Sequence, residues 1–337
     1  MRSVELTLHM HRKTVHFIHT ERSFDPHVRL TVLTRCFLIY MHKRNLFIWA
    51  HLLSFGTSMA WAQQPPTEDN LQQRINSVRE HTLNNLRTLK AGTFMMGDWG
   101  NEQGQRYDSE PDSRPVHSVT LDQFQMMAYK VTYDEFDTFT DATHKERINA
   151  DQVLVEYRSP RRPAGVSWYG AKAYCGWLAK LTGKPFDLPT EAQWEYAARS
   201  EGKQLLYATD NGKIDRGRNY PGQPFSGTPE FLPDVGSYPP NPSGLFGMTE
   251  VSVEWVNDWY SPDYYRRSES KNPKGPKIGT EKVQRGYFGT AENFSMVFMR
   301  GKSVPHPKIK YLIGVENPPL FPGYSNMPSN TFRCVVN

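Results

Sequence analysis

The sequence predicts one globular domain that mixes helices with strands and is rich in loops. Hydrophobic residues make up 38% and aromatic residues 13% of the 337-residue chain, which suits a buried core. The 24 glycines and 25 prolines favour a loop-rich fold over a helical bundle. No internal repeat and no Ser/Gly-rich linker divides the chain, so we expect one domain rather than two.

The first 62 residues are expected to lie outside this domain. Residues 41–44 (MHKR) are positively charged, residues 46–59 are mostly apolar, and residues 60–62 (AWA) form a small-x-small cleavage site. This order is typical of a secretory signal peptide, which we assign to residues 41–62. A membrane anchor is the alternative, but the apolar run is shorter than the ~20 residues of a membrane-spanning helix. We therefore expect the protein to be exported.

Residues 1–40 precede the predicted signal peptide and allow two interpretations. Either translation starts at Met41, or these residues form an unusually long, disordered extension of the signal peptide. Eight of the 40 Lys/Arg residues but only three of the 35 Asp/Glu residues lie within residues 1–62, so the remainder is formally neutral. The net charge of +5 therefore does not indicate a nucleic-acid partner.

The remaining chain is divided into an N-terminal helix, assigned to residues 63–87, and a domain over residues 88–337. Leucine, isoleucine and valine residues share one helical face between Leu71 and Leu89. Further helices are expected after Thr132, which with Glu135 can form a capping box, over residues 169–182, and after Thr190. A long polar loop is expected over residues 97–115. Strands are expected at residues 90–96, 116–127 and 331–336, with two more within 283–300.

Two cysteines, Cys175 and Cys334, remain after the predicted signal peptide. In an oxidising compartment they can form one disulfide, and the alternative is two separate buried thiols.

Four blocks in sequence order identify a family resemblance. They are GTFMMG at residues 92–97, VSW at 166–168, LPTEAQWEYAAR at 188–199 and NPSGLFGM at 241–248 with EW at 254–255 and DWY at 258–260. Together with RG at 285–286 and FRC at 332–334, they resemble the formylglycine-generating-enzyme family of sulfatase-modifying factors. The resemblance implies an α+β fold, a variant of the C-type-lectin-like fold with much irregular structure. It also implies that Cys175 pairs with Cys334, whereas a second family disulfide maps to Ala198 and Gly301.

The same resemblance indicates that the family's copper chemistry is lost. Formylglycine-generating enzymes hold copper with two cysteines, whose positions correspond to Ala291 and Met296, and a soft metal such as Cu(I) prefers thiolates. We therefore expect no catalytic residues and no copper. Iron is not expected either, because the histidines after the signal peptide are scattered, at positions 81, 117, 144 and 306.

Calcium is the remaining metal that the resemblance implies, since the family builds oxygen-rich sites beside the GLFGM block. The candidate ligands are the Glu254 carboxylate and the backbone carbonyls of Glu250 and Ser252, although Gly247 stands where a side-chain ligand is expected. A second candidate uses Asn219 and the carbonyl of Tyr220. An ordinary polar turn is the alternative.

The resemblance is strongest to TagR-type periplasmic regulators, which act upstream of the threonine-kinase pathway of type VI secretion. It implies a periplasmic location and a protein partner, either the sensor domain of a membrane kinase or an outer-membrane lipoprotein. The alternative is a periplasmic enzyme of altered chemistry, such as a siderophore-maturation factor, acting through residues near Arg285, Glu292 and Arg300. A weaker third possibility is an immunity or adhesion module.

The family's substrate groove is the predicted partner surface, formed by residues 287–296 and the Pro-rich loop 312–328. Core packing is the competing explanation. The candidate contacts are Tyr287, Phe288, Glu292, Phe294, Met296 and Arg300.

Overall fold

The computed structural model describes residues 4–10, 13–19, 68–152, 154–222, 232–250, 252–286, 292–307 and 321–337. The chain separates into two compact units, Met1–Gln64 and Pro65–Asn337. In the first unit, β1 (Val4–Met10) and β2 (Lys13–His19) form an antiparallel hairpin that the sequence did not predict. The signal peptide assigned to residues 41–62 lies outside the described residues. Within those residues, no helix is both long and apolar enough for a transmembrane span.

The second unit begins with α2 (Glu68–Asn84), which is followed directly by β3 (Leu86–Leu89). The prediction that the helix extends to residue 87, with an apolar face that reaches Leu89, is therefore wrong at its C-terminal end. Leu86 pairs with Met127 and Leu89 with Phe124 of the strand β6 (Phe124–Met127). This pairing buries Leu89 completely, so tertiary packing overrides the helical spacing of the leucines.

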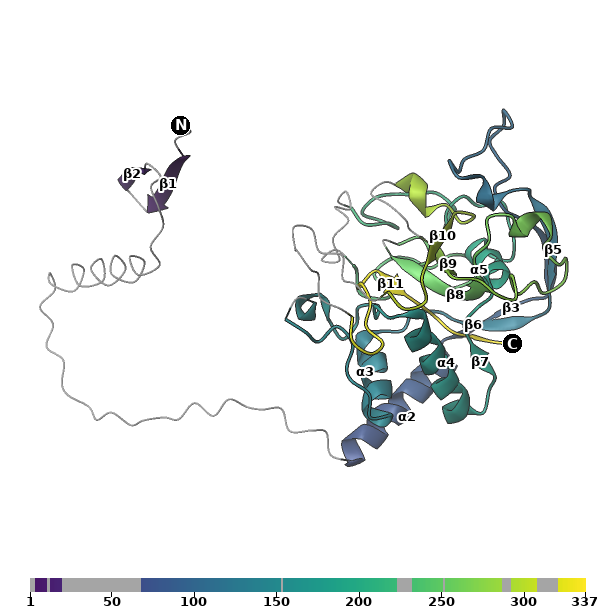
Figure 1. Cartoon of the computed structure of the whole chain (residues 1–337), viewed down its shortest axis with the longest axis horizontal. Coiled ribbons are helices and arrows are strands. Elements are labelled where there is room, and N and C mark those ends of the chain that lie inside the picture. The colour runs from purple at the N-terminus through teal and green to yellow at the C-terminus, as the bar shows by residue number, and fades with distance from the viewer. Residues whose placement is uncertain are drawn as a thin grey trace, which may run out of the picture. The chain divides into compact units, whose positions relative to one another are not determined.

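Two four-stranded sheets and one hairpin organise the rest of the domain (Figure 1). The first sheet has the order β10-β9-β8-β11, and the second has the order β3-β6-β12-β7. β4 (Gly92–Met96) and β5 (His117–Leu121) pair separately. The remaining strands are β7 (Phe186–Asp187), β8 (Val253–Trp259), β9 (Lys282–Gly286), β10 (Arg300–Ser303), β11 (Asn330–Thr331) and β12 (Val335–Val336).

Two segments that were predicted as single strands each divide between sheets. Residues 116–127 form β5 and β6, and residues 331–336 form parts of β11 and β12. β11 runs parallel to β8, whereas β12 lies between β6 and β7. An alternating pattern of apolar residues predicts the strand conformation, but it does not show where the chain changes partners.

The predicted helix starts are confirmed at α3 (Tyr133–Ala142) and α5 (Glu191–Ala198). Thr132 with Glu135, and Thr190 with Gln193, form complete capping boxes. α4 (Trp168–Thr182) begins one residue earlier than predicted. Gly183 forms its C-cap, with a left-handed φ of 72°. Short 3-10 helices lie at Pro111–Ser113, Val155–Tyr157, Tyr264–Arg266 and Glu292–Ser295.

A disulfide between Cys175 of α4 and Cys334 lies in the centre of one core cluster. Both cysteines are fully buried, together with aromatic residues such as Tyr174 and Phe332. The pairing that the family resemblance implies is thus present in the structure. It ties the helical side of the domain, where α2, α3 and α4 lie beside one another, to the strands (Figure 1).

Candidate functional site

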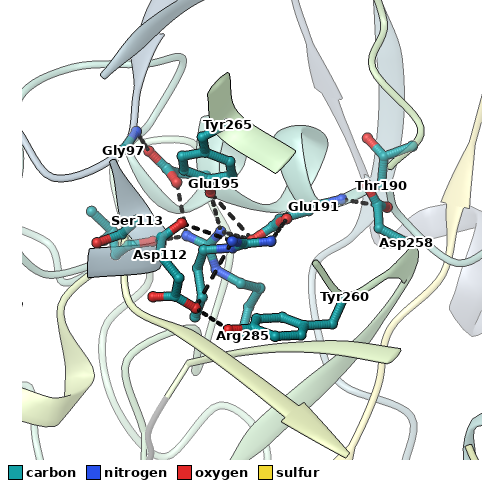
Figure 2. A network of polar contacts seen from close by, with 12 residues as sticks. Gly97, Asp112, Ser113, Thr190, Glu191, Glu195, Asp258, Tyr260, Tyr265 and Arg285 are labelled. Carbon is teal, nitrogen blue, oxygen red and sulfur yellow. Dashed lines mark hydrogen bonds and ion pairs between the residues drawn. The ribbon is translucent and has the colours of Figure 1, made fainter. Parts of the chain in front are cut away.

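A buried ionic network lies where α5 meets β9 and β10. Glu191 and Glu195 are one turn apart on α5, and their carboxylates both bind Arg285 of β9, with N–O distances of 2.8 Å in each case (Figure 2). Arg300 of β10 adds two bonds to Glu191, at 2.7 and 3.1 Å. The side chains of these four residues are at most 2% exposed.

Arg199 adds a third buried guanidinium, 3.1 Å from Glu195, and Asp112 adds a third carboxylate, 3.9 Å from Arg300, so the charges in this network are matched within the domain. Burial alone would raise the pKa of Glu191, but the nearby Arg300 and Arg285 bring it below its ordinary value. Glu195 also accepts a bond from the backbone N–H of Gly97 at 2.9 Å, so the network extends to the loop that follows β4. Such an arrangement fixes the fold around it and leaves neither arginine free to bind an anionic substrate.

Asp258 of β8 adjoins the network and has a very different electrostatic environment. Its Oδ2 accepts a hydrogen bond from the backbone N–H of Glu191 at 2.8 Å (Figure 2). Burial and the neighbouring Glu191 charge raise the pKa of Asp258 to about 7. This carboxyl group therefore titrates near neutral pH inside the core.

The positions that correspond to the copper ligands offer no thiolate. Met296 is only 8% exposed and belongs to the larger hydrophobic core cluster. Ala291 lies outside the described residues, as do Tyr287 and Phe288. Glu292 begins a 3-10 helix in which Phe294 is partly buried against the core.

Two of the predicted partner contacts are wrong. Met296 packs in the core, and the Arg300 side chain is fully buried against Glu191. Met296 stands at a position that corresponds to a copper ligand, and Arg300 follows it closely in sequence. Such a position in the sequence does not show whether a side chain is buried or exposed.

An aromatic cluster lies close to this region, where Trp99 and Tyr107 of the loop that was predicted to be polar pack on Phe298, which is fully buried. The ring of Phe298 contacts Trp99 edge-on at 5.1 Å and stacks with Tyr107 at 5.9 Å between centroids. Tyr107 is 36% exposed, and Trp99 is partly buried beneath the guanidinium of Arg199. We call Trp99, Tyr107 and Phe298 the aromatic face. Its only sequence signal is two large aromatic residues in an otherwise polar loop.

The first calcium candidate is occupied by protein cations. Lys130 donates from its ammonium to the Ser252 hydroxyl at 2.7 Å and lies 4.0 Å from a Glu250 carboxylate oxygen. Both oxygens of Glu254 accept bonds from Arg333, at 2.7 and 2.9 Å. These residues do not fit a calcium ion, because the groups nearest the expected position already carry positive charge.

The second calcium candidate is a hydrogen-bonded turn. Asn219 accepts a bond from the Asp215 N–H at 2.8 Å, and the Tyr220 carbonyl accepts one from the Gly217 N–H at 2.8 Å. Both oxygens therefore already accept hydrogen bonds from backbone N–H groups of the turn. Across the part of the chain that the structure describes, no group of three or more His, Cys, Asp or Glu side chains could hold a metal ion.

A cavity of about 420 Å³ lies between α2, the start of α3 and the segment around Val235. His81 of α2 lines it and binds Glu135 of α3 through Nδ1 at 3.0 Å. The hydrogen bond to Glu135 raises the pKa of His81, although partial burial opposes it. This pair links the N-terminal helix to the capping box of α3.

Comparison with known proteins places the domain in a family. Residues 72–337 match the family model described as the sulfatase-modifying factor enzyme 1-like domain. The chain belongs to this family. The α+β architecture predicted from the motifs is accordingly confirmed, and the solved structure of PvdO from Pseudomonas aeruginosa shares it with a TM-score of 0.56 at 26% identity, covering 75% of this chain and 94% of that one.

Two relatives show how this sulfatase-modifying-factor domain occurs in other proteins. The formylglycine-generating enzyme of Mus musculus is 28% identical in an alignment of length 281 that covers 68% of this chain and 72% of the enzyme. The serine/threonine-protein kinase pkn1 of Chlamydia pneumoniae is 32% identical in an alignment of length 227 that covers 60% of this chain. The match spans only 33% of that kinase. The same kind of domain is therefore found both in an enzyme and as one part of a longer kinase.

Proposed function

We propose that this protein is a non-catalytic binding module that regulates a partner through protein–protein contacts. One observation carries the proposal: no thiolate remains for the family's copper chemistry. Buried Met296 stands at one ligand position, and the only cysteines after residue 62, Cys175 and Cys334, are joined in a disulfide. A thioether and an alkyl side chain cannot replace two thiolates as copper ligands.

The aromatic face is the proposed contact surface. Exposed aromatic side chains are enriched at the centres of protein interfaces, because they bury a large area and lose little rotational freedom. Phe298 is held in the core, Trp99 is held by Arg199, and Tyr107 stacks on Phe298. The surface is thus rigid before a partner arrives, which lowers the entropic cost of binding.

The proposed partner is the extracytoplasmic sensor domain of a membrane threonine kinase, and the alternative partner is an outer-membrane lipoprotein. The TagR-type resemblance supports a role upstream of the kinase pathway of type VI secretion. Similarity to a segment of a protein named as a serine/threonine kinase supports a link between this domain and kinases. The predicted signal peptide supports a periplasmic location.

Binding of a purified kinase sensor domain from the same organism, measured by calorimetry, tests this proposal. Tyr107→Ser should weaken binding at least tenfold, because an aromatic anchor at an interface contributes more than ~1.4 kcal/mol. Tyr169→Ser is the matched control, since Tyr169 is 51% exposed and lies edge-on to Trp168 on a different part of the domain. Absence of binding by the wild type, or equal losses in both variants, would contradict the proposal.

The alternative, an enzyme of altered chemistry such as a siderophore-maturation factor, is less well supported. Of its candidate residues, Arg285 is buried in ion pairs with Glu191 and Glu195, and Arg300 is buried in an ion pair with Glu191. Turnover of a siderophore precursor by the purified protein would favour this alternative.

A further inference from the structure

Lys130 is a buried cation in the region where the family resemblance implies calcium. It lies between β6 and α3, and its side chain is only 1% exposed. The ammonium donates a hydrogen bond to the Ser252 hydroxyl at 2.7 Å and lies 4.0 Å from Oε2 of Glu250. A lysine is almost never buried in this way without a counter-charge. Here the counter-charge is the carboxylate of Glu250, a residue whose backbone carbonyl is a candidate calcium ligand.

The second carboxylate of the region is also neutralised by a protein cation. Arg333 binds both oxygens of Glu254, at 2.7 and 2.9 Å. The same guanidinium donates to the backbone carbonyls of Ala128, at 3.0 Å, and Phe246, at 2.7 Å. Since these contacts fix Arg333 from several sides, Glu254 cannot turn towards a metal ion without breaking a buried bidentate ion pair.

The space for a side-chain ligand at position 247 is filled as well. A Cβ atom on Gly247 would lie 2.6 Å from Oε2 of Glu250, and the φ angle of Gly247 is +69°. The Glu250 carboxylate therefore occupies the room that a ligand at residue 247 would need. One further oxygen, Oε1 of Glu250, has no hydrogen-bond partner, but calcium takes six to eight oxygen ligands.

We propose that Lys130 replaces a divalent cation in this domain. Its ammonium compensates the charge of Glu250 and, through the hydroxyl of Ser252, ties the residue before β8 to the segment between β6 and α3. Two carboxylates, one lysine and one arginine make the cluster neutral without a metal ion. The contacts of Lys130 and Arg333 then hold this region at any calcium concentration.

Thermal unfolding of the purified protein in excess calcium and in excess chelator tests this proposal. The wild type should unfold at the same temperature in both conditions. Lys130→Met should lower the unfolding temperature by on the order of 10 °C, since it leaves Glu250 buried without a counter-charge. Lys271→Met is the matched control, because Lys271 is 68% exposed and lies 3.5 Å from Asp122, and its shift should be within a degree or two.

The double variant Lys130→Met/Glu250→Gln completes the test. It should recover much of the loss, because it removes both buried charges together. A calcium-induced rise in the unfolding temperature of the wild type would overturn the proposal, and so would equal shifts in Lys130→Met and the control. Should Lys130→Met fail to fold, the calcium response of the wild type still decides.

Discussion

Arg300 of β10 and Glu191 of α5 form a bidentate ion pair across 109 residues of sequence, with N–O distances of 2.7 and 3.1 Å. The pair closes a buried network in which Arg285 binds both Glu191 and Glu195. The network joins the LPTEAQWEYAAR block to the strands on either side of the lost copper site. In this domain the network stabilises the fold, so removing one of its members should lower the free energy of unfolding.

Glu191→Gln tests that role. The substitution removes the carboxylate that both Arg285 and Arg300 bind, while the nearby Glu195 is shared with Arg199 and Asp112 lies 3.9 Å from Arg300. The free energy of unfolding should therefore fall by about 3–5 kcal/mol. Urea denaturation at pH 7 measures the change. Glu281→Gln is the control, because Glu281 lies 3.4 Å from Lys302 and is 33% exposed, and its loss should stay below about 1 kcal/mol. Similar losses in the two variants would show that the network contributes no more than a surface pair.

Asp258 predicts an unusual dependence of stability on pH. Its pKa is about 7 in the folded domain and about 4 in the unfolded chain, so the folded state favours the protonated form. The stability from this group is fully present below about pH 4 and is lost as the pH rises to about 7. Asp258→Asn should therefore be more stable than the wild type at pH 8, by as much as about 4 kcal/mol, and the two should converge towards pH 4. Urea unfolding across that range measures it, and a variant that is less stable at pH 8 would contradict the account.

The disulfide should contribute strongly to stability, because it closes a loop with a sequence separation of 159 residues. The chain-entropy relation gives a stabilisation of about 5 kcal/mol for a loop of this length. Reductant should therefore lower the unfolding temperature of the wild type. It should leave unchanged the already lower unfolding temperature of Cys175→Ala/Cys334→Ala. A reductant-insensitive wild type would contradict this prediction.

The contact between His81 and Glu135 should make the attachment of α2 sensitive to pH. The pKa of His81 is raised in the folded state, so its contribution is complete below the unfolded value of about 6.5 and is lost as the pH rises through the folded value. Amide hydrogen exchange in α2 should therefore quicken, relative to that in α4, above neutral pH. His81→Gln should remove this difference, and its persistence in the variant would exclude His81 as the cause.

The sequence predicted the local elements of this fold better than its long-range contacts. Thr132 and Thr190 identified the starts of α3 and α5, because a capping box is contained within four residues. Glu191 and Glu195 are one helical turn apart, but their partners Arg285 and Arg300 lie about a hundred residues away. No periodicity predicts such pairs in a single sequence.

The candidate site was predicted only in part, for the same reason. The loss of the thiolates follows from residue identity at Ala291 and Met296. The burial of Met296 and the position of Lys130 beside Glu250 depend instead on how distant segments pack. The aromatic face also required the structure, because Phe298 joins Tyr107 only through the fold.

The proposal that this protein lacks copper chemistry is tested most directly by an oxidation assay. The purified protein, supplied with Cu(I) and oxygen, is incubated with a cysteine-containing peptide, and the peptide mass is followed against a formylglycine-generating enzyme as the positive control. We predict full recovery of the unmodified thiol peptide with this protein. Copper-dependent conversion of the cysteine to an aldehyde by this protein would contradict the account.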